Sequence, residues 1–264
     1  MFNAAIGLGG TKTYITAIED TVLKRLPLDS QVLLDTQKMD FLKGDRLEII
    51  GYSTSDNHYK ILVLSPNLDL IGGWYAFIPH VKIDDPDVKE LISLEQLLAI
   101  ATRTPAYKLE ALITPLNAAM VRYQINSRIR ICHFIAQVAH ESDGFNTCCE
   151  YADGSAYEWR DDLGNTQEGD GVRFKGRGLI QVTGRENYHQ VSTALNIDFL
   201  NNPPLLEEPV NACLSAGWYW SSRDLNPLAD ADEVYKITLI INGGYNGINC
   251  RVEYLDKAKE VFGI

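Results

Sequence analysis

A long apolar helix that leads directly into a carboxylate constrains the fold of this chain more than any other feature. Ser127 has a side chain suited to cap a helix, and apolar residues recur at helical spacing at positions 131, 134, 135 and 138. This pattern predicts a buried helix over 128–139. Glu141 follows at its C-terminal end, on or beside the buried face. The pattern therefore favours a mainly helical domain built around this helix.

Similar patterns predict that other helices surround it. The segment from Ser93 to Gln96 is a capping box, which predicts that a helix begins at residue 94. Pro115 predicts a kink or a restart in the helical pattern that contains it. Residues 143–172 have no periodic pattern, and loops of this length in compact domains are usually functional or disordered. The remaining helices are predicted over 109–123, 186–195, 209–221, 231–241 and 251–262.

The first third of the chain has the pattern of β structure instead. Short β-branched or aromatic runs alternate with turn signals, and strands at this spacing predict a small barrel. Residues 84–92 begin with an acidic stretch that contains a proline, which is typical of a linker. We therefore expect a β module over 1–83, a linker over 84–92 and a helical domain over 93–264. The predicted strands are 14–18, 46–50, 59–64 and 74–78.

Several strings of the first module resemble those of bacterial SH3-like modules that associate with the cell wall. The resemblance implies a small all-β SH3-like barrel that binds the cell wall. Trp74, Tyr75 and His58 are candidates for a sugar-binding face, and an equally good interpretation places each of them in the barrel core or a turn. The matching strings are residues 21–25, 41–45, 57–61, 74–77 and 80–83.

The composition excludes several classes of protein. The net charge of −11 and the pI near 4.9 argue against binding to nucleic acid, which requires a basic surface. No run approaches the roughly 20 apolar residues that span a bilayer, so we expect no membrane insertion. The five cysteines lack Cys-x-x-Cys or Cys/His spacing, so we expect reduced thiols and no metal. We also expect no cofactor and a monomeric protein.

The N-terminal sequence bears on localisation. Residues 1–10 lack the basic start and the long apolar core of a secretory signal. We therefore expect a cytoplasmic protein that reaches the cell wall by a phage-type export route or when the host lyses.

Glu141 is the first candidate for acid/base chemistry. Burial beside an apolar face and the negative end of the helix dipole both disfavour the ionised carboxylate, as a general acid requires. The simpler interpretation is a surface glutamate beside the Asp143-Gly144 turn. The physical chemistry of the sequence leaves both open.

Hydrolysis of a glycosidic bond needs a second carboxylate, and the loop offers several. Retaining and inverting enzymes need carboxyl separations of roughly 5 Å and 6.5–9.5 Å, and a loop can satisfy either. Spacing in the sequence therefore does not choose among the candidates. These are Glu150, Asp153, Glu158, Asp161 and Asp162.

Two glycine-rich segments are suited to close approach of backbone and ligand. Gly176-Arg177-Gly178 lacks the phosphate-loop pattern, and its glycines allow backbone to approach a ligand or the catalytic helix. Gln181 and Thr183 alternate with apolar residues, which predicts an extended segment with both polar side chains on one face. Asn242-Gly243-Gly244 offers amides after an apolar helix, although a helix cap is the simpler interpretation.

Together these strings resemble the family 19 glycoside hydrolases, the chitinases and related bacterial and phage endolysins. The resemblance covers about residues 93–264. It implies a mainly α, lysozyme-like bilobal catalytic domain and an inverting mechanism. The matching strings are residues 134–142, 157–166, 169–188 and 240–244.

The resemblance also implies roles for particular residues. Glu141 takes the general-acid position, Glu158 takes the general-base position, and Thr183 replaces a hydroxyl residue that holds the attacking water. Glu150 lies between the two glutamates and is a rival for the base; otherwise it belongs to the substrate groove. The other implied positions are Gln181, Asn187, Tyr188 and Asn242 in the substrate groove, and His140 and Arg251 beside the carboxylates.

One departure from the family pattern bears on the substrate. The interval from Glu141 to Glu158 is 17 residues, shorter than in the plant enzymes, and the loops between are shorter too. This disfavours long crystalline chitin and favours peptidoglycan. We therefore expect an endolysin-type hydrolase that cleaves β-1,4 bonds of the peptidoglycan glycan strand.

Three alternatives remain. A chitinase acting on chitin oligomers is close, because chitin and peptidoglycan share a β-1,4-linked amino-sugar backbone. A lytic transglycosylase would use Glu141 alone and would tolerate loss of Glu158. A non-catalytic wall-binding protein is the third alternative, disfavoured by the presence of Glu141, Glu158 and Thr183 together.

Overall fold

The chain divides into two units, Met1–Lys89 and Glu90–Ile264. The computed structural model describes residues 13–55, 57–63, 72–83 and 90–264. The boundary between the units falls within the predicted linker 84–92. Residues 84–89 of that linker, and the N-terminal residues 1–12, lie outside the described residues.

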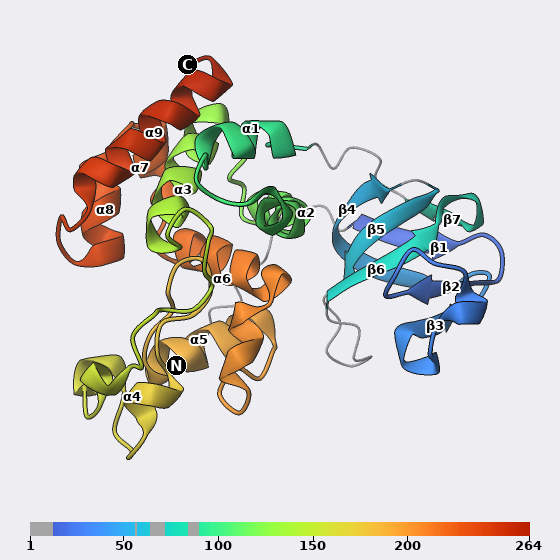
Figure 1. The fold of residues 1–264 in the computed structure, drawn as a ribbon, viewed down its shortest axis with the longest axis horizontal. Helices are drawn as coiled ribbons and strands as arrows, with labels where there is room; N and C mark the ends of the chain where they lie inside the picture. The colour runs from blue at the N-terminus through green and yellow to red at the C-terminus, as the bar shows by residue number, and fades with distance from the viewer. Residues whose placement is uncertain (1–12, 56, 64–71, 84–89) are drawn as a thin grey trace, which may run out of the picture. The chain divides into compact units, whose positions relative to one another are not determined.

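In its described residues, the first unit is one antiparallel sheet of seven strands (Figure 1). The strands are hydrogen-bonded in the order β3-β2-β6-β5-β4-β1-β7. The edge strands β3 and β7 do not pair with each other in this part of the chain, so the sheet is open. The all-β prediction is confirmed, but the predicted barrel is not. The strands are β1 (Thr13–Ala17), β2 (Thr21–Lys24), β3 (Lys38–Phe41), β4 (Arg46–Ser55), β5 (His58–Val63), β6 (Gly72–Phe77) and β7 (Val81–Ile83).

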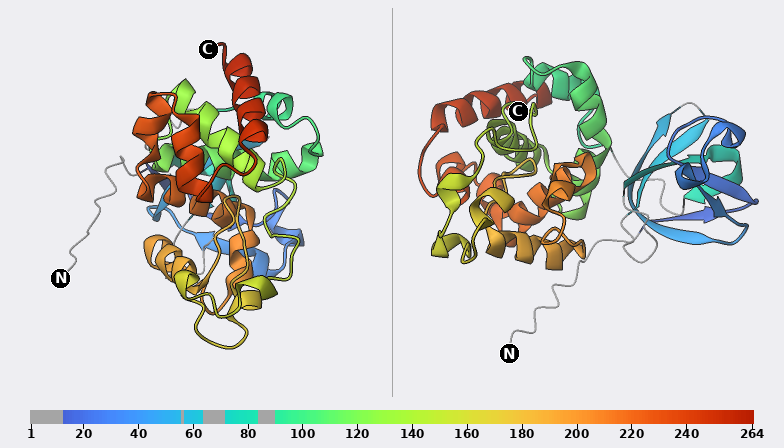
Figure 2. Two further views of the ribbon diagram at one scale, coloured as in Figure 1. Left: turned by 90° about the vertical axis from the view of Figure 1, so that its left-hand side faces the viewer. Right: turned by 60° about the horizontal axis from the view of Figure 1, so that its bottom comes forward.

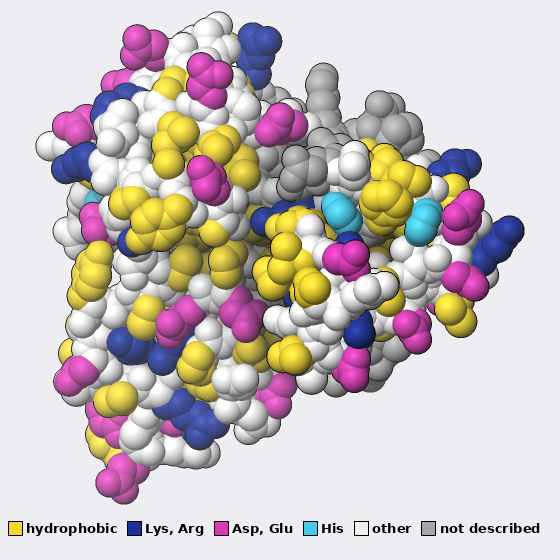
Figure 3. Space-filling model, turned by 45° about the vertical axis from the view of Figure 1, so that its right-hand side comes forward, with side chains coloured by type: hydrophobic (Ala, Val, Ile, Leu, Met, Phe, Trp, Pro, Cys, Tyr) yellow, Lys and Arg dark blue, Asp and Glu magenta, His cyan; other side chains and the backbone are white. Residues whose placement is uncertain are grey.

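The alternation of side chains along β6 decides the place of its aromatic residues. Trp74 and Ala76 face the hydrophobic core of the sheet and are 4% and 0% exposed, whereas Tyr75 between them is half-buried. The Arg25 guanidinium lies 4.0 Å from the centre of the Trp74 ring. Trp74 is therefore a core residue and not part of a sugar-binding face. Figure 3 shows hydrophobic side chains and histidines exposed together on the surface of this unit.

The second unit is helical in its described residues, and α3 packs against α7 and α9 within it. Ser127 accepts a hydrogen bond from the Arg130 amide and begins α3 as predicted. The helix is buried from Ile131 to Ala139, and Phe134 packs edge-on against Trp220 at 5.4 Å between ring centres. The helices are α1 (Leu94–Ile100), α2 (Ala106–Arg122), α3 (Arg128–Glu141), α4 (Asp170–Arg173), α5 (Arg185–Leu195), α6 (Pro209–Ser222), α7 (Leu225–Asp230), α8 (Val234–Asn242) and α9 (Ile248–Phe262).

Most helix predictions are confirmed to within a few residues, and the exceptions have physical causes. The capping box at Ser93 forms as expected, with both reciprocal hydrogen bonds present. Pro115 lies inside α2 and does not end it. Short α7 was not predicted, because Pro227 in its middle mimics a turn signal.

The long loop lies at one end of the helical unit, far from the C-terminus of α9 (Figures 1 and 2). α3 packs along α9, and α2 packs along α6. The loop holds short 3₁₀ turns at Ser155–Tyr157 and Asp161–Leu163 before the single turn of α4. The loop begins directly after the C-terminal end of α3.

Candidate active site

Glu141 ends α3 and is fixed by an arginine from α9. Its Oε1 accepts a hydrogen bond of 2.5 Å from Arg251 Nη2. The Glu141 side chain is 17% exposed, whereas that of Arg251 is completely buried. The sequence predicted an apolar setting for Glu141 and only a supporting position for Arg251. The structure shows that this support is a direct ion pair between residues 110 positions apart.

A buried polar chain holds the arginine in place. Arg251 Nη1 donates to Gln137 Oε1 at 2.5 Å, and Gln137 Nε2 donates to Thr238 Oγ1 at 3.1 Å. All three residues are completely buried. A buried guanidinium is stable only when it is paired and its N–H groups have acceptors. The chain therefore links α3, α8 and α9 into a rigid support for the Glu141 carboxyl group.

His140 lies beside Glu141 and packs on a glycine. Burial, and after it the positive charge of Arg251, lower the pKa of His140 to about 4. The imidazole is therefore neutral at neutral pH. A Cβ on Gly247, which has a φ of +72°, would lie 2.1 Å from His140 Cε1. Only glycine fits at this position, both for its backbone conformation and for the space the ring occupies.

Glu150 is carried by a short extended segment that pairs with the glycine-rich segment. Glu150 N donates to Gly176 O at 3.0 Å, and Gly178 N donates to Cys148 O at 2.8 Å. The Glu150 carboxyl group receives two further hydrogen bonds, from Gly176 N at 2.7 Å and from Tyr157 Oη at 3.0 Å. Backbone and side chain are therefore both fixed.

Gln181 and Thr183 flank the same glycine, but not on an extended segment. Residues 177–182 form a tight turn, closed by the pairing of Arg177 with Val182, and Gln181 has a φ of +56°. The expectation of an extended segment was wrong, because the turn is set by the packing of Gly178 against α6. A Cβ on Gly176 would lie 2.8 Å from Gln181 Oε1, 3.2 Å from Thr183 Oγ1 and 3.4 Å from Glu150 Cδ. The three side chains therefore surround one α-carbon.

A cavity of about 380 Å³ is lined both by the C-terminal end of α3 and by the Glu150 segment. We call it the Glu141–Glu150 pocket, because both carboxylates line it. Thr183 is not among the residues that line it, although its hydroxyl lies close to Glu150. The other lining residues that matter below are His140, Asp143, Tyr151 and Gln181.

Glu158, the implied general base, lies elsewhere. Its Oε1 accepts from Gly169 N at 2.6 Å and its Oε2 accepts from Gly171 N at 2.7 Å. These amides belong to the first turn of α4, where an N-terminal helix dipole also favours a carboxylate. Glu158 does not line the Glu141–Glu150 pocket. In this structure its carboxylate caps α4.

The remaining predicted groove residues differ in their exposure. Tyr188 is completely buried; it donates to Lys175 O at 2.7 Å and accepts from Arg177 Nη1 at 2.9 Å. It therefore supports the glycine-rich turn from behind and does not line the open pocket. Asn187 is half-buried and donates to Thr183 O at 2.7 Å, and Asn242 is exposed at the end of α8.

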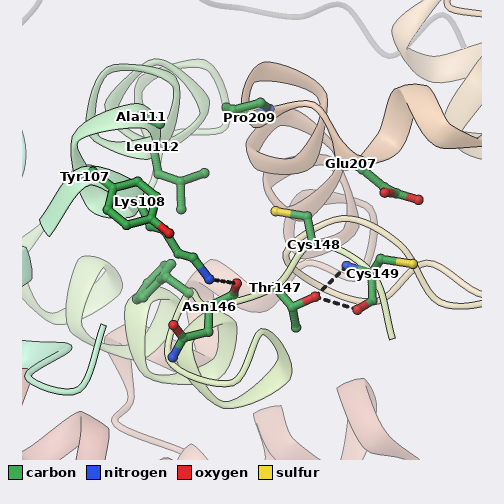
Figure 4. Close-up of a pocket in the computed structure, with 11 residues that line it drawn as sticks. Tyr107, Lys108, Ala111, Leu112, Asn146, Thr147, Cys148, Cys149, Glu207 and Pro209 are labelled. Carbon is green, nitrogen blue, oxygen red and sulfur yellow. Dashed lines mark hydrogen bonds between the residues drawn. The ribbon is translucent and has the colours of Figure 1, made fainter. Parts of the chain in front are cut away.

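A second cavity, of about 360 Å³, lies behind the Glu150 segment (Figure 4). Its walls come from α2, α6 and residues 145–149, and Thr147 lines both cavities. Lys108 reaches across it to donate to Asn146 O at 2.6 Å. Burial raises the pKa of the Cys148 thiol, which lines this cavity, to about 11, so the thiol is protonated at neutral pH.

Of the residues that line the Glu141–Glu150 pocket, the sequence predicted only His140, Glu141, Glu150 and Gln181 as site residues. Tyr151 follows Glu150 directly and could have been found from that position alone. Cys250 and Tyr254 lie in α9 and Arg103 in the turn after α1, and no local pattern points to them.

Two absences can be stated for the part of the chain that the structure describes. No helix there has both the length and the apolar character needed to cross a bilayer. Within the same residues, His, Cys, Asp and Glu side chains do not gather in threes as ligands for a metal ion. All five cysteines lie in described segments and carry free thiols.

Comparison with known proteins gives the chain its relatives. The model of glycoside hydrolase family 19, described as class I chitinase, matches residues 107–238, half of the chain. A glycosyl hydrolase family 19 domain-containing protein of Haemophilus influenzae is 40% identical over 92 residues, 34% of this chain and 44% of that protein. Acidic endochitinase Q of Nicotiana tabacum is 30% identical over 158 residues, 52% of this chain and 58% of that protein. The chain thus spans about half the length of these curated relatives.

Solved structures agree on the fold. Chitinase C from Streptomyces griseus has a TM-score of 0.55 and 22% identity, over 68% of this chain and 96% of that one. A bacterial family 19 chitinase has a TM-score of 0.55 and 21% identity, over 66% of this chain and 96% of that one. At these identities the likeness concerns the fold alone.

Proposed function

The chain belongs to glycoside hydrolase family 19, and on that premise we propose that it hydrolyses β-1,4 bonds between N-acetylated amino sugars. The observation that carries the proposal is that Glu141 and Glu150 line one pocket. Most glycosidases use two catalytic carboxylates, one on each side of the scissile bond. The family match includes both residues.

Glu141 is the proposed general acid. Arg251 donates to Oε1, which leaves Oε2 to carry the proton toward the glycosidic oxygen. As the bond between C1 and that oxygen breaks, the proton passes to the leaving sugar. The buried support of Arg251 fixes the carboxyl group, which fits a role that depends on geometry.

Glu150, and not Glu158, is the proposed general base. Glu150 shares the pocket with Glu141, whereas the two oxygens of Glu158 are bound to amides of α4. The donors to Glu150, Gly176 N and Tyr157 Oη, fix its carboxylate without filling all four of its lone pairs. Two lone pairs remain, and either can take a proton from water.

Thr183 orients that water in this proposal. Its hydroxyl donates to Gln181 O at 2.9 Å, so Oγ1 offers only its lone pairs to a third group. A water that donates one hydrogen to Thr183 Oγ1 and the other to Glu150 would present its own lone pair to C1. Attack from the face opposite the leaving group gives inversion, which needs carboxyl groups roughly 6.5–9.5 Å apart to admit the water.

For the substrate we propose the glycan strand of peptidoglycan. The support is the separate β unit, whose cavity of about 530 Å³ is lined by His58, Phe77 and His80 and suits attachment to an insoluble wall. Chitin is the second candidate, because the tobacco relative is named an endochitinase and the two solved structures are chitinases. Both glycans have the same β-1,4-linked backbone.

Product analysis tests the proposal. Purified peptidoglycan and chitin oligomers are digested in parallel, the fragments are identified by mass spectrometry, and the first-formed anomer is recorded by proton NMR. Reducing-end N-acetylmuramic acid with the α-anomer formed first is the expected result. Cleavage of chitin alone would transfer the proposal to chitin. Anhydro-muramic products, or the β-anomer formed first, would overturn the two-carboxylate inverting mechanism.

A further inference from the structure

Tyr151 combines high exposure with a fixed side chain. Of the large hydrophobic side chains in the described segments, it has the highest exposed fraction, 79%. Its hydroxyl donates to Asp143 Oδ2 at 2.9 Å. An exposed tyrosine normally samples several rotamers, so a hydrogen bond that holds its ring in solvent gives the ring a defined position without burying it.

The backbone on both sides of the ring is fixed as well. Lys175 Nζ donates to Glu150 O at 3.3 Å and to Ala152 O at 3.1 Å, so one ammonium group ties the residues before and after Tyr151. Asp143 itself has a left-handed backbone, with a φ of +52°. The loop that carries the Tyr151 ring is therefore fixed by hydrogen bonds to its backbone.

The position of the ring is the second observation. Tyr151 and Asp143 both line the Glu141–Glu150 pocket, and Tyr151 directly follows Glu150 in the chain. An aromatic face left uncovered at a polar cavity is a surface for the apolar side of a ligand. Three carboxylates, Glu141, Asp143 and Glu150, line the same cavity with a single guanidinium, that of Arg103, so its excess of negative charge disfavours an anionic group at the ring.

A neutral, flat ligand with an apolar face fits these constraints. The pyranose ring of a β-linked N-acetyl amino sugar has axial C–H groups on one face and hydroxyl groups at its edge. We propose that Tyr151 is a stacking platform for a sugar ring adjacent to the scissile bond, and that Asp143 is the positioning residue that holds this platform. This inference rests on the proposed function and adds a specificity-determining residue to it.

The kinetic signature of a platform differs from that of a catalytic group. A sugar next to the scissile bond stacks in the ground state and in the transition state alike, so its loss raises KM and leaves kcat nearly unchanged. Tyr151→Ala should raise KM about 10-fold, the effect of losing one aromatic stack. Tyr151→Phe keeps the ring and loses only the bond to Asp143, so KM should rise about 2-fold.

The test measures kcat and KM of the full chain on a soluble N-acetylglucosamine hexamer, or on soluble uncrosslinked peptidoglycan strands if wild type does not cleave the hexamer. The variants are Tyr151→Ala, Tyr151→Phe and the matched control Tyr107→Ala. Tyr107 is 67% exposed and lines the second cavity, so its loss should leave both constants unchanged. Calorimetric binding in a Glu141→Gln background, where the glycan is not cleaved, should show the same ranking.

Each outcome decides the inference. An unchanged KM for Tyr151→Ala would overturn it. A fall in kcat at constant KM would also overturn it, because Tyr151 would then act through Glu150. A rise in KM for Tyr107→Ala alone would place the glycan in the second cavity. If wild type neither cleaves nor binds either glycan, the proposed function itself fails, and that failure is distinguishable from the others.

Discussion

Two stretches of the same loop carry similar carboxylates and use them differently. Glu150, in residues 143–151, accepts hydrogen bonds of 2.7 and 3.0 Å and faces Glu141 across a pocket. Glu158, in residues 155–174, accepts hydrogen bonds of 2.6 and 2.7 Å and caps α4. The number of hydrogen bonds does not separate the two. What separates them is that Glu150 lines the Glu141–Glu150 pocket and Glu158 does not.

The largest effect should come from Glu141, the proposed general acid. Glu141→Gln keeps the size of the side chain and an oxygen for Arg251, and removes the transferable proton. We expect kcat to fall about 10³-fold in a protein that still folds, with a lower melting temperature because buried Arg251 loses its charged partner. Steady-state assays and calorimetry on one preparation measure both. Activity within about 10-fold of wild type would exclude Glu141 as the general acid.

The second prediction concerns the stability of the α4 side. Glu158→Gln leaves one amide of α4 without an acceptor and weakens the other hydrogen bond, at a cost of about 1–2 kcal/mol. For a unit of this size the melting temperature should fall by about 3–6 °C. Glu110→Gln, at an exposed glutamate within α2 and outside its first turn, is the control and should not change it. An unchanged melting temperature in Glu158→Gln would show that Glu158 does not stabilise the protein by capping α4.

The third prediction concerns pH and the α3 side of the pocket. The pKa of His140 is about 4 in the folded chain and about 6.5 when unfolded, so the unfolded state binds the proton more tightly. The contribution of His140 to stability is therefore complete above pH 6.5 and is lost as the pH falls toward 4. His140→Gln should reduce the fall in melting temperature between pH 7 and pH 4.

The control for this measurement is His189→Gln, because His189 is exposed on α5. It should keep the wild-type dependence of the melting temperature on pH. If His140→Gln also keeps it, the imidazole of His140 is not shielded from protonation as the structure implies.

The helical framework could be predicted because its signals are local. Ser127 caps α3, the apolar stripe buries it, and Glu141 follows at its end, all within a few turns of one helix. The ion pair between Glu141 and Arg251 could not be predicted from spacing, since it depends on how α9 packs on α3. The family resemblance implied that Arg251 lies beside the carboxylates, but it did not show that Arg251 pairs with Glu141.

The sequence could not decide whether Glu150 or Glu158 is the general base, for a similar reason. Both lie in a loop without periodicity, and the decision depends on pairing of the Glu150 segment with Gly176 and on the first turn of α4. The tight turn at Gln181 was missed because alternating polar and apolar residues favour a strand, whereas packing of Gly178 against α6 overrides that local preference.

We propose that Glu150 is the second catalytic carboxylate, beside Glu141 in one pocket. The most direct measurement is kcat of Glu150→Gln and Glu158→Gln on one soluble glycan, at a temperature where both variants are folded. We predict a loss of about 10²-fold or more in Glu150→Gln and a change of less than about 3-fold in Glu158→Gln. The reverse pattern, with Glu158→Gln inactive and Glu150→Gln active, would contradict the account.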